Sequence, residues 1–413
     1  MTHELTIAGP TLEEVERART TLTGVVDVTP MESSHYLSRV LGQPVFMKCE
    51  NLQRTGSYKI RGAYNRISSL SDDEKARGVV AASAGNHAQG VAFAARELGI
   101  PATIFMPIGV ALPKLAATRD YGADVVLRGH TVAEPLKAAA EHAERTGAVY
   151  IPPFDHPDVV AGQGTLGLEV LDQVPDLATV VVPIGGGGLI SGMASVLKQR
   201  AAALGREIRV IGVQAVNAAA YPVSLAAGAP TEITISPTIA DGIAVSKPGK
   251  LNFAIIKDTV DDVVTVDDDD IARAMLVLLE RAKLVVEPAG AVGVAAILTG
   301  KVRATGPTVV MLSGGNIDPL IMERVISHGL AASERYLKLR IPLPDRPGQL
   351  ARTSEIVAAQ NANVVEVLHT RHGTGLAISQ VELELHIETR GPEHAEQVLG
   401  ALRAEGYEPR VDF

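Results

Sequence analysis

One lysine stands where a side-chain amine could do covalent chemistry. Lys59 follows Thr55, Gly56 and Ser57 and heads the helix-like run KIRGAYNRI. A lysine that is held near strand ends and partly removed from water can present a neutral amine to an aldehyde and form a Schiff base. Taken alone, the segment also fits a surface lysine in a basic helical turn.

Three loops of small residues add a second kind of chemistry. They read SAGN at 83–86, GGGG at 185–188 and SGGN at 313–316, and each follows a short apolar run. Four glycines let backbone N–H groups approach a phosphate closely, and a helix beginning near Leu189 would favour its negative charge. GGGGL matches neither a P-loop, which needs GK[ST], nor the dinucleotide-binding order GxGxxG. We expect a phosphate site here, although close helix packing would also use such glycines.

The surrounding sequence indicates an α/β fold. Between about residues 75 and 330, short valine-rich runs alternate with alanine-rich segments of helical length. This alternation predicts a mostly parallel sheet that is covered on both faces. Ligands in such open sheets bind at the carboxyl ends of the strands, which is where the three loops lie. The expected strands are 78–82, 102–106, 124–127, 179–183, 209–213 and 308–312.

The chain changes character near residue 334. The remaining residues read as strand, helix, strand, strand, helix and strand, which predicts a ferredoxin-like βαββαβ unit over 335–413. We expect a catalytic part over 1–330, in which a small subdomain at about 55–150 is inserted in a larger one. A linker is expected at 331–334.

Composition and charge exclude several classes of protein. The 413 residues carry 38 Lys and Arg against 47 Asp and Glu, a net charge of −9, with 6 Phe, 8 Tyr and no Trp. These values oppose an electrostatic nucleic-acid footprint and a base-stacking surface. The start of the chain lacks a basic segment followed by an apolar one, and no apolar run reaches the roughly 18 residues of a membrane span. We therefore expect a cytoplasmic protein.

Two features that could suggest other sites have structural interpretations. Cys49 is the single cysteine, so it cannot form an internal disulfide, and we expect a small buried residue. Asp267 to Asp270 precede an amphipathic stretch, where aspartates cap a helix start and favour its dipole. The 11 histidines show no HExxH or other ligand spacing, so we expect no metal site.

Four motifs resemble, in their order and spacing, the tryptophan-synthase-β type (fold type II) of pyridoxal-phosphate enzymes: SYKIRGA, SAGNHAQG, GGGGL and SGGN. The match is closest to the threonine dehydratases, also called threonine ammonia-lyases, and covers about residues 10 to 330. The resemblance implies bound pyridoxal 5′-phosphate and elimination of water from L-threonine, and from L-serine, giving 2-oxobutanoate or pyruvate and ammonia. The segment DRPGQL at 345–350 is similar to an ACT domain. That similarity implies an amino-acid effector such as isoleucine or valine, with a dimerisation module that binds nothing as the alternative.

The resemblance also implies roles for single residues. Lys59 would hold the cofactor as a Schiff base and take the Cα proton as general base, and Asn86 would donate to the oxygen at position 3 of the cofactor ring. Ser313 would face the pyridine nitrogen, and Tyr58 and Glu287 would lie near the ring. The expected cofactor-binding residues are Lys59, Tyr58, Asn86, Gly185, Gly186, Gly187, Gly188, Leu189, Glu287 and Ser313. The expected substrate-carboxylate residues are Ser83, Ala84, Gly85, Asn86 and His87.

Positions at which this sequence differs from related families favour one activity over the others. Serine racemases and serine dehydratases share these motifs, but racemisation needs a second acid–base group where this chain has Ala84. Racemases also carry acidic metal ligands at positions that here hold Gln214 and Ala220, which favours a dehydratase without a divalent metal. A monovalent cation held by carbonyls stays open. Preference for threonine over serine rests on the resemblance alone, because one methyl group is worth only about 1–3 kcal/mol.

Two other classes compete with this assignment. A nucleotide-dependent oxidoreductase would need GxGxxG followed about 20 residues later by an acidic residue. A catalytically silent amino-acid sensor would explain the tail but leave Lys59 without a role. The expected partners are a small amino-acid substrate and an amino-acid effector, with no nucleic acid and no membrane. Because each chain has one ACT-like unit, we expect two chains to pair their sheets in a homodimer or homotetramer.

Overall fold

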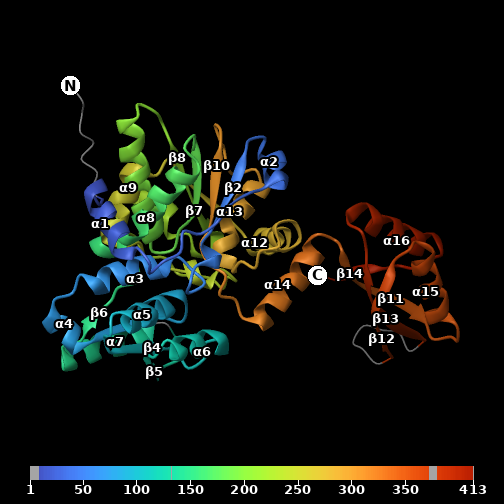
Figure 1. Cartoon of the computed structure of the whole chain (residues 1–413). Coiled ribbons are helices and arrows are strands. Elements are labelled where there is room, and N and C mark those ends of the chain that lie inside the picture. Colours follow the sequence, from blue (N-terminus) through green and yellow to red (C-terminus); the bar gives the residue numbers. More distant parts are fainter. Residues whose placement is uncertain (1–8, 132, 372–378, 413) are drawn as a thin grey trace. The chain divides into compact units, whose positions relative to one another are not determined.

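The structure is a computed structural model that describes residues 9–131, 133–371 and 379–412. It divides into two compact units between Ile321 and Met322, inside helix α14 (Pro319–Ala332) (Figure 1). The linker predicted at 331–334 covers the end of this helix and the two residues that follow it. Of the unit expected at 335–413, residues 372–378 and Phe413 lie outside the described residues.

A six-stranded sheet forms the centre of the first unit. Its spatial order is β1-β2-β10-β7-β8-β9, and all neighbours pair in parallel except the antiparallel pair β1 and β2. Every residue of β7 and β10 is buried, as expected for strands covered on both faces. The bounds are β1 Met31–Ser33, β2 Val45–Cys49, β7 Thr179–Pro183, β8 Arg209–Ala215, β9 Asp262–Val266 and β10 Thr308–Leu312.

A smaller sheet is inserted in the sequence between β2 and β7. Its order is β5-β4-β3-β6, and all its pairs are parallel. The bounds are β3 Val79–Ala82, β4 Ala102–Met106, β5 Asp124–Leu127 and β6 Val149–Tyr150. The six expected strands are therefore confirmed, with β3 starting one residue later and β8 running on to Ala215.

Helices surround both sheets (Figure 1). Those before β7 are α1 Leu12–Leu22, α2 His35–Leu41, α3 Lys59–Ser68, α4 Asp72–Arg77, α5 Asn86–Glu97, α6 Leu112–Asp120, α7 Ala133–Thr146 and α8 Pro157–Gln173. Those after β7 are α9 Gly188–Ala203, α10 Ala220–Ala227, α11 Lys250–Thr259, α12 Asp268–Val277 and α13 Pro288–Leu298. Short helical turns lie at η1 Glu50–Leu52, η2 Val216–Ala218, η3 Asp241–Ile243 and η4 Leu278–Ala282.

Alternation along β7 shows how the large sheet is packed. Val180 and Val182 share a buried core with side chains of α8 and α9. Val181 points the other way, toward α13, where a Cβ added at Gly293 would lie 3.4 Å from its Cγ1. Because successive side chains of a strand point to opposite faces, one apolar run supplies both helical layers. The carboxyl ends of the strands are left free for the loops that carry the candidate site.

The C-terminal unit has the expected ferredoxin-like order. Its elements are β11 Tyr336–Pro344, α15 Gln349–Ala359, β12 Asn363–Thr370, β13 Gln380–Glu388, α16 Pro392–Ala404 and β14 Arg410–Asp412. The strands form one antiparallel sheet in the order β12-β13-β11-β14. Alternate side chains of β11, including Leu339 and Ile341, are fully buried in a core with α16 residues such as Val398. This period of two fits a sheet with one covered face.

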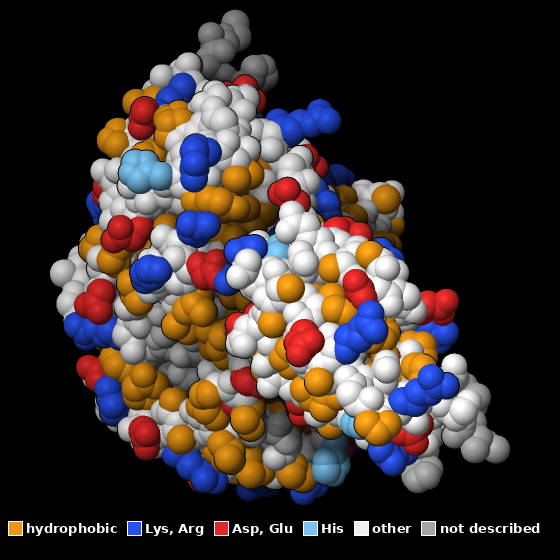
Figure 2. All heavy atoms as spheres, turned by 90° about the vertical axis from the view of Figure 1, so that its right-hand side faces the viewer, with side chains coloured by type: hydrophobic (Ala, Val, Ile, Leu, Met, Phe, Trp, Pro, Cys, Tyr) orange, Lys and Arg blue, Asp and Glu red, His pale blue; other side chains and the backbone are white. Residues whose placement is uncertain are grey.

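The distribution of charged side chains on the surface agrees with the acidic composition. Figure 2 shows Lys and Arg side chains interspersed with Asp and Glu on the face that it displays, rather than gathered into a basic stripe. Among the described residues, no helix is long and apolar enough to cross a membrane. Asp267 caps α12 by accepting a hydrogen bond from the Asp270 N–H at 2.8 Å, which confirms the expected helix start.

Candidate active site

Lys59 is the first residue of α3, and the residues before it pair with the loop that follows β10. Ser57 forms an antiparallel bridge with Gly314, and the Tyr58 N–H donates to Ser313 O at 3.2 Å. This pairing of segments that lie far apart in the sequence fixes where α3 begins. It also brings together three of the predicted site residues, Lys59, Tyr58 and Ser313.

The Lys59 amine is directed at the main chain of a third segment. Its Nζ donates to Pro153 O at 3.0 Å and lies 5.3 Å from the centre of the Tyr58 ring. The Lys59 side chain is partly buried, so it is partly removed from bulk water. This is the setting in which a lysine can react with an aldehyde.

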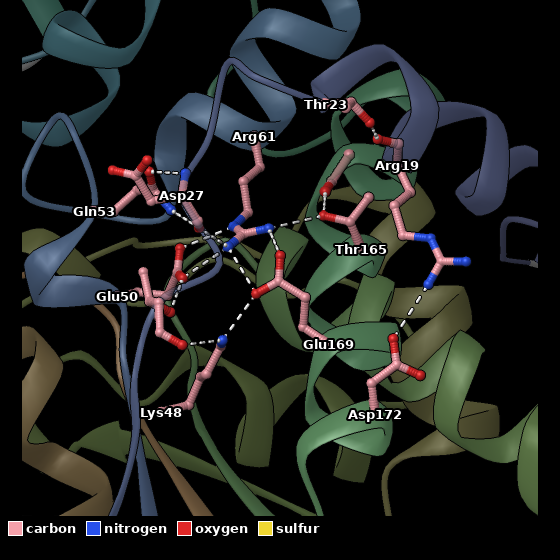
Figure 3. Close-up of polar contacts among 12 residues, drawn as sticks. Arg19, Thr23, Asp27, Lys48, Glu50, Gln53, Arg61, Thr165, Glu169 and Asp172 are labelled. Carbon is pink, nitrogen blue, oxygen red and sulfur yellow. Dashed lines mark hydrogen bonds and ion pairs between the residues drawn. The ribbon is translucent and has the colours of Figure 1, made fainter.

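A buried cluster of charges anchors α3 two residues further on (Figure 3). The Arg61 guanidinium is fully buried and pairs with two carboxylates. Its Nε and Nη2 donate to Glu50 at 2.9 and 2.8 Å, and its Nη1 and Nη2 donate to Glu169 at 2.6 and 3.1 Å. Lys48 of β2 reaches the same Glu169 carboxylate at 2.8 Å. The cluster thus joins α3 to β2, η1 and α8.

The cluster stays ionised because its members are paired. Burial by itself raises the pKa of the Glu50 carboxyl, but the attraction and hydrogen bonds of Arg61 outweigh burial and hold this pKa below its ordinary range. Buried charges without such partners cost several kcal/mol, roughly 3–5 when one member of a pair is removed. The motif SYKIRGA contains Arg61, yet sequence reasoning gave it no role. The sequence did contain one signal of this role, because Arg61 is a charged residue on the apolar side of a helix.

Two glycines let α3 approach α8 closely. A Cβ at Gly62 would lie 2.8 Å from Val159 O, and a Cβ at Gly162 would lie 2.6 Å from Arg61 O. Both approaches involve backbone atoms that cannot move aside without shifting a helix. Together with the charge cluster, this contact sets the position of the helix that begins at Lys59.

The tetraglycine loop follows β7 and opens helix α9. Within the described part of the chain, the backbone N–H groups of Gly185, Gly186 and Gly187 donate no hydrogen bond. Gly187 has φ +101, and a Cβ there would lie 2.2 Å from the Tyr221 hydroxyl. Leu189 is buried in the first turn of α9, where N–H groups have no intrahelical acceptor. Converging free N–H groups at a helix start form an anion site.

The amine and the anion site border adjacent residues, Pro153 and Phe154. Pro153 O accepts from Lys59 Nζ, and a Cβ at Gly186 would lie only 2.3 Å from the neighbouring Phe154 ring. A Cβ at Gly188 would lie 3.1 Å from Phe154 Cβ. The residues present therefore fit a group that carries an aldehyde for Lys59 and an anion for the glycines, as pyridoxal phosphate does.

Asn86 is held by hydrogen bonds on both sides of its amide. Its Nδ2 donates to Glu287 Oε1 at 2.6 Å, and its Oδ1 accepts from Asn316 Nδ2 at 2.8 Å. Asn316 also donates to Thr55 O at 2.8 Å. These contacts fix the amide orientation and leave one N–H of Asn86 for a further acceptor. Asn316 closes the SGGN motif, but the sequence did not show that it contacts Asn86.

Glu287 is a buried carboxyl at the same place, only 4% exposed. Burial raises its pKa from 4.5 to about 7, against opposing effects of Lys114, the Asn86 amide and Lys59. Its protonation therefore changes near neutral pH. Perturbed carboxyl groups in such surroundings are common at functional sites.

The loop after β3 offers main-chain donors. Gly85 N donates to Ser83 Oγ at 3.1 Å, whereas the N–H groups of Ala84, Asn86 and His87 have no acceptor among the described residues. The loop runs into α5, so the helix dipole also favours a bound anion. Ala84 contributes only a methyl group.

The His87 ring is neutral and makes its hydrogen bond to a backbone carbonyl of the protein. Burial, together with the positive charge of Lys59, lowers its pKa to about 3. A neutral ring beside a carbonyl must donate, so Nε2 donates to Ile151 O at 2.9 Å. The side chain therefore offers no positive charge to a carboxylate, which leaves that task to the backbone.

The remaining predicted positions are placed as follows. Ser313 is 4% exposed, and within the described chain its hydroxyl has no hydrogen-bond partner. Gln214 donates to Ile184 O at 3.3 Å, next to the glycine loop, and accepts from Tyr221 N at 2.9 Å. Burial raises the pKa of Cys49 to about 12, as expected of an unreactive thiol. In the described residues, no three His, Cys, Asp or Glu side chains are grouped to hold a metal.

Comparison with known proteins gives a consistent result. A family model described as "Pyridoxal-phosphate dependent enzyme" matches residues 22–314. An L-threonine ammonia-lyase of Thermotoga maritima is 48% identical over 97% of this chain and 99% of its own length. An L-threonine ammonia-lyase of Geobacter sulfurreducens is also 48% identical, over 92% of this chain and 94% of its own length.

Solved structures agree with the sequence relatives. The structure of maize serine racemase matches with a TM-score of 0.72 and 35% identity, over 78% of this chain and 98% of that chain. Threonine deaminase isoform 2 from Solanum lycopersicum matches with a TM-score of 0.71 and 37% identity, over 79% of this chain and 98% of that chain. With its amine, its glycine loop and these relatives taken together, the chain belongs to the pyridoxal-phosphate-dependent enzyme family.

Proposed function

We propose that this protein is an L-threonine ammonia-lyase that eliminates water from L-threonine, and from L-serine, to give a 2-oxo acid and ammonia. The observation that carries the proposal is the shared border of the reactive amine and the anion site, with Lys59 bonded to Pro153 O and Phe154 against Gly186. The bacterial relatives that are 48% identical carry that activity in their names. They support threonine as the preferred substrate.

Different residues of the site have different roles in the proposed reaction. When bound, pyridoxal phosphate supplies an electron sink that stabilises negative charge at the substrate Cα. Lys59 would be the residue that holds the cofactor aldehyde, and its amine would serve as the general base for the substrate Cα proton. Gly185, Gly186 and Gly187 would hold the phosphate through their backbone N–H groups, and the free N–H of Asn86 would donate to the oxygen on the cofactor ring.

Ser313 and the loop after β3 favour elimination over other reactions of the substrate. The Ser313 hydroxyl would be a neutral partner for the cofactor ring nitrogen and would not enforce its protonation, so the bound cofactor would spread negative charge less widely than beside a carboxylate. Elimination, in which the proton taken from Cα and the β-hydroxyl leave together as water, would then be favoured over return of the proton to Cα. Backbone N–H groups of Ala84, Asn86 and His87 bind the substrate carboxylate and orient Cα toward Lys59.

Serine racemisation is the second candidate, because maize serine racemase has a similar structure. A racemase needs an acid–base group on the face of Cα opposite to the lysine. Ala84 has no proton to transfer, which favours elimination. Accumulation of D-serine from L-serine, in place of pyruvate, would establish the racemase instead.

The direct test is to assay the purified holoenzyme with L-threonine. We expect 2-oxobutanoate and ammonia in equal amounts, and a larger kcat/KM for L-threonine than for L-serine. The expected difference is modest, about ten- to a hundredfold, because a single methyl group discriminates the two substrates. Absence of keto acid from both substrates would reject the lyase function.

We also propose that the C-terminal unit is an ACT-like regulatory domain that binds a branched amino acid such as isoleucine or valine. A cavity of about 220 Å³ lies at the start of α15, lined by residues 344–350, His369, Arg371 and Val381. Gly348 has φ +90 and is the N-cap of α15, whose first N–H groups suit a carboxylate.

Substitution at Gly348 tests this site in the full-length protein. Aspartate and asparagine both tolerate its left-handed backbone, and a Cβ there meets no atom within 4 Å. Gly348→Asp should abolish isoleucine binding measured by calorimetry, because its charge opposes the ligand carboxylate. Gly348→Asn is the matched neutral control and should retain binding. Equal affinity in both variants would move the effector away from this cavity.

A homo-oligomer is the expected assembly. Among the described strands, β12 is at the edge of its sheet and pairs on one side only, and it exposes Val365, Val367 and Leu368. An edge with apolar side chains invites pairing with a second copy. Val367→Lys should lower the molar mass measured by light scattering, whereas Glu366→Lys, at the neighbouring position, should act less strongly. An unchanged mass would place the contact elsewhere.

A further inference from the structure

The segment between β6 and α8 contacts both halves of the cofactor site. Pro153 O accepts a hydrogen bond from Lys59 Nζ at 3.0 Å, and Phe154 lies against Gly186 and Gly188. Neither Pro153 nor Phe154 has a polar side chain with which to hold its own backbone in place. The next residue, Asp155, is the polar side chain that does so.

Asp155 caps a helix that is distant in the sequence. Its carboxylate accepts hydrogen bonds from the backbone N–H groups of Lys250, Leu251 and Asn252 at 2.9, 3.1 and 3.3 Å. These are the first three residues of α11, and the N-cap residue of that helix is Gly249, which has no side chain to cap it. A carboxylate satisfies the orphan N–H groups and interacts favourably with the helix dipole.

The capped helix touches the glycine loop from its own side. A Cβ at Gly187 would lie 2.9 Å from both Asn252 Cβ and Ile256 Cδ1 of α11. Asn252 Nδ2 also donates to Phe154 O at 3.1 Å. Asp155 therefore joins the segment that contacts Gly186 and Gly188 to the helix that contacts Gly187.

Gly249 is shaped to admit this carboxylate. A Cβ at Gly249 would lie 2.3 Å from Asp155 Oδ1. Any larger residue would push the carboxylate away from the N–H groups that it caps. The sequence therefore provides both the acceptor and the space for it, in two segments that lie far apart in the chain.

We propose that Asp155 is a positioning residue for cofactor binding. By capping α11 it fixes Pro153 O, which orients the Lys59 amine, and Phe154, which shapes the phosphate-binding loop. One carboxylate thus sets the distance between the amine and the anion site. The role concerns the cofactor alone, so it stands or falls separately from the identity of the substrate.

Two variants of the full-length protein test the role. Asp155→Ala removes the cap, whereas Asp155→Asn keeps one acceptor oxygen and turns an NH2 group toward a backbone N–H. After cofactor removal, titration with pyridoxal phosphate should give a dissociation constant about tenfold higher for Asp155→Ala, the factor that loss of a helix cap represents. Asp155→Asn should lie between this value and the wild type, and it decides the question if Asp155→Ala does not fold.

Asp267→Ala is the matched control for loss of a helix cap. Asp267 caps α12 by accepting from Asp270 N at 2.8 Å, and in the described structure it bonds to no residue of the cofactor site. The unfolding midpoint of the cofactor-free protein should fall in both Asp155→Ala and Asp267→Ala. Only the Asp155 variants should lose cofactor affinity.

Two smaller probes separate the two halves of the site. Pyridoxal lacks the phosphate and reports on Lys59, while inorganic phosphate reports on the glycine loop. Asp155→Ala should weaken both. Wild-type affinity for pyridoxal phosphate in both Asp155 variants, with a lowered unfolding midpoint, would reduce Asp155 to a structural cap. Weakening of only one probe would contradict the claim that one carboxylate positions both groups.

Discussion

The charge cluster around Arg61 and the loops around Lys59 meet the same helix, α3, but use polar groups in opposite ways. Every nitrogen of the Arg61 guanidinium donates to a protein acceptor, and Glu50 and Glu169 are paired in turn. Around Lys59, the N–H groups of Gly185, Gly186 and Gly187 and the Ser313 hydroxyl have no partner in the described structure.

This difference separates the residues that hold the backbone of α3 in place from the residues that bind cofactor and substrate. Saturated groups fix the backbone that carries Lys59, and groups with free hydrogen-bonding capacity line the place where cofactor and substrate fit. Changes in the first region should therefore cost folding stability, and changes in the second should cost binding or turnover. The following predictions test that division, beginning with the largest expected effect.

Lys59→Ala should reduce turnover of L-threonine by about a thousandfold or more, because it removes both the covalent attachment and the general base. The unfolding free energy should change by less than about 1 kcal/mol, because Lys59 is partly exposed and makes one hydrogen bond. Keto-acid assays and urea denaturation measure the two quantities. Lys137→Ala, at a side chain that is 80% exposed, is the control and should retain full activity. Substantial deamination by Lys59→Ala would refute the assignment.

Arg61→Met should show the opposite pattern. Removing Arg61 leaves the buried Glu50 carboxylate without its ion-pair partner and leaves Glu169 paired with Lys48 alone, so it should lower the unfolding free energy by about 3–5 kcal/mol. Urea denaturation of the cofactor-free protein measures this loss. The control is Arg17→Met, which breaks a pair with Glu13 at a side chain that is 63% exposed and should cost less than about 1 kcal/mol. Similar small losses in both variants would show that the cluster does not hold α3.

Glu287 predicts a pH dependence of stability. Burial raises the pKa of its carboxyl to about 7, so the folded protein binds a proton that the unfolded chain releases above pH 4.5. Stability from this group is full below pH 4.5 and is lost as pH rises toward 7. The stability of the cofactor-free wild type relative to Glu287→Gln should therefore fall by about 3 kcal/mol between pH 4 and pH 8. A difference that does not vary with pH would mean that the carboxyl is ionised throughout.

Tyr221→Phe should have the smallest effect, within the support of the glycine loop. The fully buried Tyr221 hydroxyl donates to Gly186 O at 3.1 Å, and its loss should cost about 1 kcal/mol. Pyridoxal-phosphate affinity should fall about fivefold, with kcat for bound enzyme unchanged. Tyr150→Phe, whose hydroxyl bonds to no described residue, should bind as the wild type does. Unchanged affinity in Tyr221→Phe would mean that the loop holds its shape without this hydroxyl.

Local patterns in the sequence predicted much of the fold. Buried strands such as β7 and β10 read as valine-rich runs, and the C-terminal unit showed its elements in order. β2 was not predicted because it precedes the alternating region of residues 75–330, and only the folded structure shows that its Lys48 is paired with Glu169. The domain boundary that the sequence predicts at 331–334 stays a prediction.

The candidate site was predictable where single segments carry the chemistry. The position of Lys59 before a helix and the four glycines after β7 have local physical reasons. A single sequence does not reveal contacts between distant segments. Examples are the contact of Asn316 with Asn86 and that of Asp155 with the start of α11. Such pairs depend on how the loops at the strand ends converge in space.

The most direct test is to reduce the purified holoenzyme with sodium borohydride and map the modified peptide by mass spectrometry. A Schiff base at Lys59 predicts that the yellow absorbance disappears and that one reduced pyridoxyl-phosphate group is recovered on the peptide containing residue 59. The same treatment of Lys59→Ala should label no peptide. A label on any other lysine, or no label on the wild type, would contradict the assignment of the amine and the mechanism built on it.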